Sequence, residues 1–287
     1  MREPVGVVGL GVVGGTAATA LEQAGVPVHV YDPYLDVGGP QELGACGVVF
    51  LCVPTPGRAH MGFDLSEVWR AAHDIGPHVS PDAVVAVKST VPPGTNDRLA
   101  AAFPKIEFAS VPEFLVAARP LETFTQPDRV VLGVRSHDAA ERLTAIANEY
   151  APGAPVIILR PIEAELAKLC ANALLGAKVA LANELSDVCA GHAVSWGRVQ
   201  AAVGLDRRIG PDHLTVSERR GFGGACLPKD LDGLIAAARG AGRTPELLTA
   251  IAEYNRSIRV EGARDASPNG KARRAEDEAG RQARAAL

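Results

Sequence analysis

The stretch VGVVGLGVVGG, residues 5–15, decides the fold of this 287-residue chain. Its first four residues are apolar and mostly β-branched, and they predict a buried strand that leads directly into the GxGxxG spacing of Gly9, Gly11 and Gly14. Gly9 permits a tight turn, Gly11 lets a pyrophosphate approach the backbone, and Gly14 lets the next helix pack on the strand. The stretch therefore predicts a dinucleotide site at the N-terminus of a helix over 13–24.

An acidic residue follows at the distance that a ribose-binding carboxylate requires. Asp32 ends the second predicted strand, 18 residues after Gly14. A carboxylate there binds the adenosine ribose hydroxyls and repels a 2′-phosphate, so the sequence predicts NAD rather than NADP. Val12 and Val13 are expected to belong to the same site. A strand–helix junction that is merely rich in turns would leave Asp32 unexplained.

Residues 5–159 alternate short β-branched runs with helical segments, which is typical of a doubly wound parallel sheet. Helices are expected between most of the strands, for instance over 64–76 and 138–150. The pattern predicts an α/β fold with a Rossmann-type domain over residues 1–160. The predicted strands are 5–8, 26–31, 47–53, 83–87, 106–110, 129–134 and 155–159.

The second half of the chain is predicted to be helical. Residues 162–191 contain no proline and place apolar residues at helical spacing over a length that exceeds an ordinary globular helix. We expect this helix to bridge domains or to build a dimer, as the centre of a smaller all-α domain over 161–260. Residues 261–287 are highly charged, which indicates a disordered tail or a solvated helix. The other predicted helices are 196–204, 228–239 and 245–258.

Composition narrows the classes of partner. Hydrophobic residues make up 47% of the chain, charged residues 22%, and the net charge is −4, so nothing favours nucleic acid or an anionic membrane. The five cysteines form an odd set without CxxC or zinc spacing, which predicts no metal site and a reduced, cytoplasmic protein. The N-terminal apolar stretch is interrupted by glycines and lacks the basic start of a signal peptide, and no run is long enough to span a membrane.

Two later loops follow predicted strands at the edge where open α/β sheets bind ligands. The first contains Val53, Pro54 and Thr55, and the second contains Ser89 and Thr90. Their hydroxyls and backbone are candidates for cofactor contacts. Ordinary turn chemistry would supply the same residue types, and spacing alone favours neither interpretation.

The stretch GFGGACLPKD, residues 221–230, places Cys226 between permissive glycines and a proline that suits the first residue of a helix. If Pro228 begins that helix, its dipole and unpaired N–H groups lower the pKa of the Cys226 thiol. Lys168 and Asn172 are four residues apart on the long predicted helix and share a face. They can support a thiolate or hold a developing oxyanion. The competing interpretations are a solvated surface lysine and a cysteine that serves as a small core residue.

These motifs together resemble the nucleotide-sugar 6-dehydrogenases of the UDP-glucose and UDP-mannuronate types over roughly residues 5–258. The matching stretches include VGLGVVG, CVPTP, KSTVPPGT, VPEFL, PDRVVLG, DRRIG and GFGGACLPKD, in this order. The resemblance implies an NAD-dependent, four-electron oxidation of a primary alcohol to a carboxylate. In it, Cys226 attacks the aldehyde formed by a first hydride transfer, a second NAD oxidises the thiohemiacetal to a thioester, and water releases the acid.

The resemblance also assigns roles residue by residue. Lys168 and Asn172 would hold the substrate oxygen, Asp230 would support proton transfer or orient the water, and Thr90 and Glu113 would complete a proton relay. Arg208 would reach the substrate of a neighbouring subunit, which requires a homodimer built on the long helix. The implied substrate-binding residues are Glu113, Phe114, Leu115, Lys168, Asn172, Arg208, Phe222 and Gly223.

The chain departs from the family pattern in two places. A second glutamate that usually follows four residues after the PEFL glutamate is replaced by Ala117. Typical members also continue into a third domain that binds the nucleotide end of the substrate, whereas this sequence ends at residue 287. The reaction is therefore better supported than UDP-glucose as the substrate, and a shorter nucleotide sugar, a nucleoside or another primary alcohol stays open.

Two other functions fit parts of the sequence. Hydroxyacid dehydrogenases, such as the 6-phosphogluconate and 3-hydroxyisobutyrate enzymes, share the layout but perform one oxidation without a cysteine. A non-catalytic NAD-binding scaffold is the second alternative, although the residues that carry the chemistry all persist. One or two NADH per substrate distinguishes the two kinds of enzyme.

Overall fold

The structure is a computed structural model that describes residues 2–58 and 62–260. The prediction for 261–287 lies outside the described residues. The elements are β1 (Val5–Val8), α1 (Val12–Gln23), β2 (Val28–Tyr31), η1 (Pro40–Ala45), β3 (Val48–Leu51), β4 (Gly57–Arg58), β5 (Gly62–Phe63), α2 (Ser66–Ile75), β6 (Val84–Val87), α3 (Thr95–Ala102), β7 (Glu107–Ser110), α4 (Pro120–Thr125), β8 (Val130–Gly133), α5 (His137–Tyr150), β9 (Val156–Leu159), α6 (Pro161–Gly191), α7 (Trp196–Gly204), α8 (Leu227–Gly240) and α9 (Glu246–Ile258).

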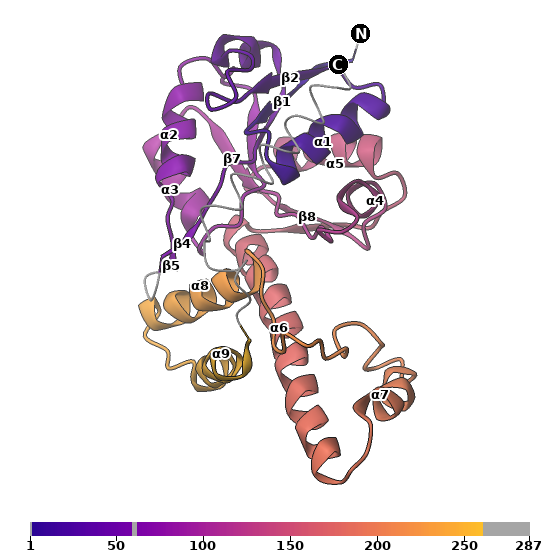
Figure 1. The fold of residues 1–287 in the computed structure, drawn as a ribbon. Coiled ribbons are helices and arrows are strands. Elements are labelled where there is room, and N and C mark those ends of the chain that lie inside the picture. The colour runs from indigo at the N-terminus through magenta and orange to yellow at the C-terminus, as the bar shows by residue number, and fades with distance from the viewer. Residues whose placement is uncertain (1, 59–61, 261–287) are drawn as a thin grey trace. The chain divides into compact units, whose positions relative to one another are not determined.

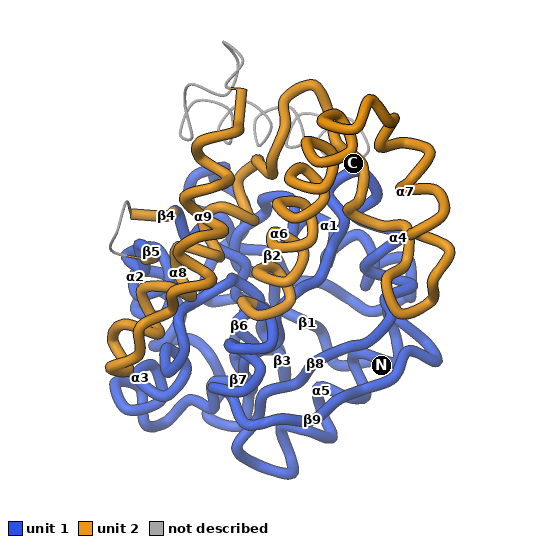
Figure 2. Tube along the Cα trace, turned by 90° about the horizontal axis from the view of Figure 1, so that it is seen from below, with its two compact units in different colours: residues 1–56, 63–168, 270–287 blue, residues 57–62, 169–269 orange. Residues whose placement is uncertain are grey.

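The described chain divides into two compact units, coloured separately in Figure 2. Unit 1 contains residues up to 56 and residues 63–168, and unit 2 contains the segment from 57 to 62 and residues 169–260. The division falls inside α6, directly after Lys168. One continuous helix therefore supplies residues to both units.

Unit 1 is built on a seven-stranded sheet in the order β2-β1-β3-β6-β7-β8-β9. Figure 1 shows α1 and α5 over one face of the sheet and α2 and α3 over the other. The residues of β1, β3, β6 and β8 are all buried, which explains their nearly continuous apolar sequences. The Rossmann-type, doubly wound fold predicted from the sequence is confirmed.

The sheet is mixed: the predicted parallel arrangement is correct for the other neighbouring strands and wrong at one junction. Strand β8 meets β7 antiparallel through Ser110 and Gly133, the last residue of each strand. A Cβ on Gly133 would lie 2.6 Å from the Cβ of Ala164 and 2.9 Å from the Cα of Pro161, so this glycine lets the first turns of α6 pack against the junction. Composition shows that β7 and β8 are strands but does not give their relative direction.

Unit 2 is helical, as predicted for the second half of the chain. Phe222, Leu231 and Ile235 form its main core together with small residues of α6 and with Ala252 of α9. A smaller cluster centres on Trp196, whose indole Nε1–H donates to the Leu214 carbonyl at 2.9 Å. Within residues 2–58 and 62–260, no helix has the length and apolar character needed to cross a membrane.

Two neighbouring glycines of α1 give a direct test of the strand–loop–helix junction. A Cβ on Gly14 would overlap the carbonyl oxygen of Gly9, whereas a Cβ on Gly15 would meet the Leu10 carbonyl oxygen at an ordinary 3.6 Å. We expect Gly14→Ala to lower the free energy of unfolding by about 1–3 kcal/mol, because the turn must shift. Gly15→Ala should raise it by about 0.5–1 kcal/mol, because alanine favours the helix. Urea unfolding of the two variants measures both changes in the free energy of unfolding. Equal changes would contradict the close approach of Gly14 to the Gly9 carbonyl.

Candidate functional site

The glycine-rich loop lies where the order of the sheet reverses direction. The loop follows β1, and Cys52–Pro54 follows its neighbour β3, so both lie at the carboxyl edge beside the switch point between β1 and β3. Gly9 has φ +86°, and a Cβ there would lie 2.8 Å from the Cys52 carbonyl oxygen. Only glycine suits this position, as the sequence predicted.

The first turn of α1 has the features of a phosphate-binding helix N-terminus. Gly11 is the N-cap, no side chain caps the helix, and the first turn holds no acidic residue. Val12 and Val13 begin the helix, so their backbone N–H groups belong to this uncapped turn. The cradle therefore fits the diphosphate of a dinucleotide.

Asp32 lies directly after β2 and is almost fully buried. Its Oδ2 accepts a hydrogen bond from Leu10 N at 2.7 Å, and its Oδ1 accepts from Tyr34 N at 3.0 Å and Leu35 N at 3.2 Å. The carboxylate thus ties the glycine-rich loop to the turn after β2. Its expected contact with a ribose stays a prediction.

The two later loops are bonded to each other. Thr55 Oγ1 donates to the Thr90 carbonyl at 2.7 Å, and Ser89 Oγ donates to the Val53 carbonyl at 2.7 Å. These two hydroxyls therefore hold the loops in their turns, which is one of the two interpretations given for them in the sequence analysis. Pro54, which lies between Val53 and Thr55 in the sequence, is exposed. Contacts of these loops with a cofactor stay predictions.

Unit 1 brings the predicted site residues Glu113 and Lys168 together. Lys168 Nζ lies 3.3 Å from Glu113 Oε1, and Glu113 Oε2 accepts from Leu115 N at 2.6 Å. The ammonium group also lies 5.3 Å from the centre of the Phe114 ring, a cation–π distance. Lys168 is 5% exposed, so the interpretation as a solvated surface lysine was wrong.

A second buried lysine of unit 1 was missed in the sequence. Lys88 directly follows β6, and its Nζ lies 3.4 Å from the Val111 carbonyl and about equally close to the rings of Phe50 and Phe124, at 5.0 and 5.1 Å. Burial lowers the pKa of Lys88, while the charges of Cys52 and Glu113 act in the opposite direction. The signal available in the sequence was a lysine that directly follows a fully apolar strand, which indicates that this lysine is buried.

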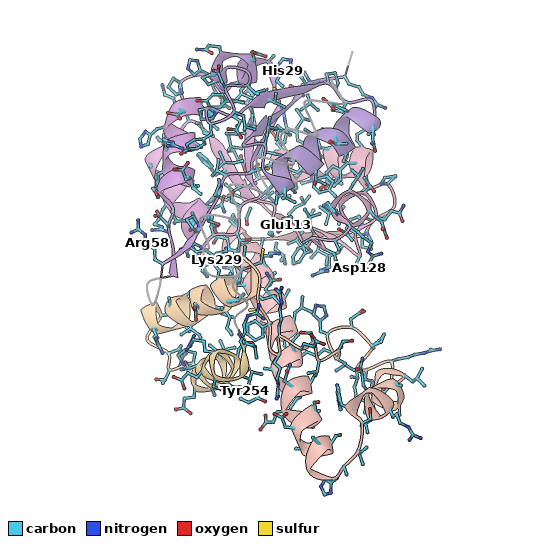
Figure 3. All side chains as sticks on the ribbon, in the orientation of Figure 1. His29, Arg58, Glu113, Asp128, Lys229 and Tyr254 are labelled. Atoms are coloured by element: carbon cyan, nitrogen blue, oxygen red, sulfur yellow. The ribbon has the colours of Figure 1, made fainter. Side chains whose placement is uncertain are left out.

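Unit 2 brings Asn172 and Asp230 together. Asn172 Nδ2 donates to Asp230 Oδ2 at 2.6 Å, and the Asp230 side chain is 1% exposed. Lys229 Nζ lies 2.7 Å from Asp230 Oδ1. Lys229, labelled in Figure 3, lies in the first turn of α8. Amide, carboxylate and ammonium thus form a buried polar cluster where α6 meets α8.

Cys226 is the N-cap residue of α8 and is exposed. Helix α8 begins at Leu227, so Pro228 is its second residue and not its first, a shift of one position from the prediction. Asp230 remains in the first turn. The thiol is therefore placed at a helix N-terminus, and the interpretation of Cys226 as a small core residue was wrong.

The loop before Cys226 is held by residues that the sequence analysis missed. Phe222 N donates to Asn255 Oδ1 at 2.7 Å, and Asn255 Nδ2 donates to the Phe222 carbonyl at 3.0 Å. Asn183 of α6 accepts from Gly221 N at 3.2 Å. Both asparagines lie within helices, α6 and α9, where this residue type is not favoured, but nothing local indicates which distant backbone group each one binds.

The remaining predicted substrate residues lie in unit 2 in different settings. Phe222 is buried in the core, where its ring packs on Gly176. Gly223 lies against Arg259, whose guanidinium a side chain at that position would overlap. Arg208 is exposed and pairs with Asp206 at 2.7 Å. The roles assigned to these residues toward a substrate stay predictions.

The doubly wound sheet, the glycine cradle at its switch point and the helical second unit define a protein of the NAD-binding dehydrogenase class. The profile of the UDP-glucose/GDP-mannose dehydrogenase family, NAD binding domain, matches residues 36–151, and that of the central domain of the same family matches residues 162–257. The chain belongs to the UDP-glucose/GDP-mannose dehydrogenase family, and the predicted family and its cofactor NAD are confirmed.

Individual relatives agree with this assignment. A UDP-glucose 6-dehydrogenase of Rickettsia bellii is 33% identical over 224 residues, which cover 75% of this chain and 50% of the relative. The structure of a UDP-glucose dehydrogenase from Pyrobaculum islandicum superposes with a TM-score of 0.82 at 30% identity, over 90% of this chain and 68% of that chain. The chain thus spans about half the length of the curated relatives it matches.

A more distant structure shares the fold alone. The 3-hydroxyisobutyrate dehydrogenase of Mycobacterium tuberculosis superposes with a TM-score of 0.71 at 17% identity, over 90% of this chain and 94% of that chain. The layout that this chain shares with hydroxyacid dehydrogenases was noted from the sequence. At this identity the likeness gives no information about chemistry.

The cysteines should differ sharply in reactivity toward iodoacetamide. Burial raises the pKa of Cys52 to about 12 and that of Cys46 to about 11, so neither forms appreciable thiolate at pH 8. Cys226 and Cys170 are exposed, but partial burial also raises the pKa of Cys170, so we expect Cys226 to be alkylated first and Cys170 next. Peptide mass spectrometry after timed labelling of the folded protein measures the order. Early modification of Cys52 would contradict the described burial.

Proposed function

We propose that this chain catalyses the NAD-dependent oxidation of the primary alcohol of a nucleotide sugar, of which UDP-glucose is the leading candidate, to a carboxylate. The observation that carries the proposal is the position of Cys226 as N-cap of α8, whose first turn holds the buried Asp230, which accepts a hydrogen bond from Asn172 of α6. A buried structural cysteine needs no such setting. The names of the relatives support the class of substrate.

The reaction balances as RCH₂OH + 2 NAD⁺ + H₂O → RCOO⁻ + 2 NADH + 3 H⁺. When bound, NAD accepts one hydride at each of two oxidation steps. Between them, the Cys226 sulfur adds to the aldehyde carbon and forms a thiohemiacetal. Loss of the second hydride leaves a thioester, and water then breaks the C–S bond and returns the thiol. Covalent capture keeps the reactive aldehyde in the site while the cofactor is exchanged.

The buried polar groups have matching tasks in this scheme. Lys168 and Asn172 donate hydrogen bonds to the substrate oxygen and stabilise the negative charge that develops on it. Thr90 and Glu113 pass the alcohol proton away, with Glu113 held by Lys168 at 3.3 Å. Asp230 orients the water that attacks the thioester. Each of these groups is a donor, an acceptor or a proton carrier of the type its step requires.

Substrate recognition is proposed to use the residues that the family resemblance assigns. Phe114 and Leu115 follow Glu113 and are proposed to contact the substrate, although the Leu115 N–H itself donates to Glu113 Oε2. Gly223 and Phe222 contribute from the loop before Cys226. Arg208 reaches the site of a neighbouring subunit.

Replacement of Cys226 tests the covalent step. We expect Cys226→Ser to lower carboxylate formation by at least about a thousandfold, because an alcohol is a far weaker nucleophile at neutral pH. Cys170→Ser is the matched control, since Cys170 is also exposed but has no role in the proposed scheme, and it should leave the rate unchanged. Acid formation by Cys226→Ser at the wild-type rate would remove the nucleophile from the scheme.

The stoichiometry of NADH separates the proposed reaction from a two-electron oxidation. Limiting UDP-glucose should yield two NADH per sugar, and other UDP-sugars, GDP-mannose, free nucleosides and nucleoside monophosphates complete the panel. One NADH per substrate would favour a hydroxyacid-type dehydrogenase. NAD binding without reduction across the panel would favour a non-catalytic scaffold.

We further propose that the protein works as a cytoplasmic homodimer. The supporting observation is an apolar stripe on α6, defined by Leu174, Leu181, Leu185 and Val188, all of which are exposed. Their spacing places them on one side of the helix. An exposed apolar stripe of this kind is typical of a surface that packs against another protein surface. A partner packed there would bring its Arg208 to the neighbouring active site.

A charge on this stripe should separate the subunits. We expect Leu181→Glu to shift the protein from dimer to monomer in size-exclusion chromatography with light scattering, because a buried carboxylate would be left unpaired in the interface. Leu205→Glu is the control, since Leu205 is 84% exposed and lies outside the stripe. A wild-type protein that is monomeric at micromolar concentration would contradict the homodimer.

A further inference from the structure

Helix α6 carries another buried polar residue one turn before Lys168. Glu165 is 2% exposed, although a carboxylate is among the groups most costly to bury. It lies on the same face of the helix as Lys168 and Asn172, at spacings of three and seven residues. None of the roles proposed above uses it, and it lies in unit 1 with Lys168.

The carboxylate of Glu165 binds the start of helix α3. Its Oε2 accepts from Gly94 N at 2.5 Å, and its Oε1 accepts from Asn96 N at 2.8 Å and from Asn96 Nδ2 at 2.7 Å. Gly94 is the N-cap of α3 with φ +85°, so it has no side chain of its own to cap the helix. A residue 69 to 71 positions away in the chain therefore supplies the cap.

The capped segment continues directly from the Thr90 loop. Thr95 Oγ1 and N both bond to the Pro92 carbonyl, at 2.7 and 3.2 Å, which closes the short turn between Thr90 and α3. On its other side the loop is tied to the loop after β3 by the bond from Thr55 to the Thr90 carbonyl. The loop is thus held from both sides by hydrogen bonds within unit 1.

Glu165 is therefore the point at which α6 is joined to the loop that carries Thr90. Lys168 lies one turn further along the same helix and pairs with Glu113. A shift of α6 relative to α3 would change the position of Lys168 relative to Thr90, two groups that the proposed reaction uses together. The orientation of the Asn96 amide is set by the same carboxylate, because its oxygen cannot face a negative charge.

We infer that Glu165 is a positioning residue, which holds Lys168 of α6 in register with the Thr90 loop through the N-terminus of α3. This inference rests on the proposed function, since Lys168 and Thr90 are proposed catalytic residues. The negative charge is suited to the task because it faces the N-terminal end of a helix dipole and three N–H donors. Glutamine has the same shape but would oppose one of these donors with its own N–H.

The test compares Glu165→Gln with Glu163→Gln. Glu163 lies two residues earlier on α6, but its carboxylate faces Arg160 at the surface, so it is a control for charge and helix propensity. With UDP-glucose and NAD, kcat of Glu165→Gln should fall at least tenfold with each KM changed less than threefold. The rate is expressed per NAD site counted by fluorescence titration, so a fraction of unfolded protein does not lower it. Glu163→Gln should match wild type.

A second arm needs no substrate. In hydrogen–deuterium exchange, amides of the segment 88–96 should exchange at least tenfold faster in Glu165→Gln than in wild type and Glu163→Gln. Asn96→Ala removes only the side-chain donor and should give an intermediate increase, which serves as the test if Glu165→Gln does not fold.

The outcomes separate the two proposals. Wild-type protein that oxidises nothing refutes the proposed function, and the exchange arm then still tests the anchor. Active wild type with an equally active Glu165→Gln overturns the positioning role. Unchanged exchange in Glu165→Gln overturns the anchor itself.

Discussion

The burial of polar side chains along one face of α6 is the constraint on which the rest of the structure depends. Glu165, Lys168 and Asn172 are each less than 7% exposed, and a buried polar group is costly unless it finds a partner. Each has one: the N-terminus of α3, the carboxylate of Glu113 and the carboxylate of Asp230. The helix therefore cannot slide or rotate without leaving charges unpaired, and this holds its residues in register with the segments they contact.

These partners come from segments far apart in the chain. Glu113 lies on the loop after β7, and its two oxygens join the loop to the helix and to its own backbone. Asp230 lies in the first turn of α8, whose N-cap residue is Cys226. The need to pair buried charges thus accounts for the Lys168–Glu113 ion pair of unit 1 and, separately, for the Asn172–Asp230 hydrogen bond of unit 2. A buried ion pair of this kind is weak evidence for stability, because the cost of removing both charges from water offsets their attraction.

Much of the candidate site follows from local sequence because backbone geometry demands particular residues. Gly9 has a left-handed φ, and Gly14 packs against the Gly9 carbonyl, so the tight strand–helix junction requires glycine at both positions of the GxGxxG motif. The buried strands β1, β3 and β6 were recognisable from apolar runs. Helix α3 was not among the helices delimited from the sequence, because its residues TNDRLAAA follow a proline-rich turn and its cap comes from Glu165 rather than from its own sequence.

The sequence by itself determined the glycine cradle after β1, the doubly wound alternation of strands and helices, and the helix that begins behind Cys226. Each of these depends on steric or periodic properties of neighbouring residues. Only the tertiary structure decided that β8 meets β7 antiparallel, that Lys168 is buried against Glu113, and that Glu165 and Asn255 hold loops far away in the chain. The physical reason is that a hydrogen bond or an ion pair is a property of two groups, and the second group is not specified by the residues around the first.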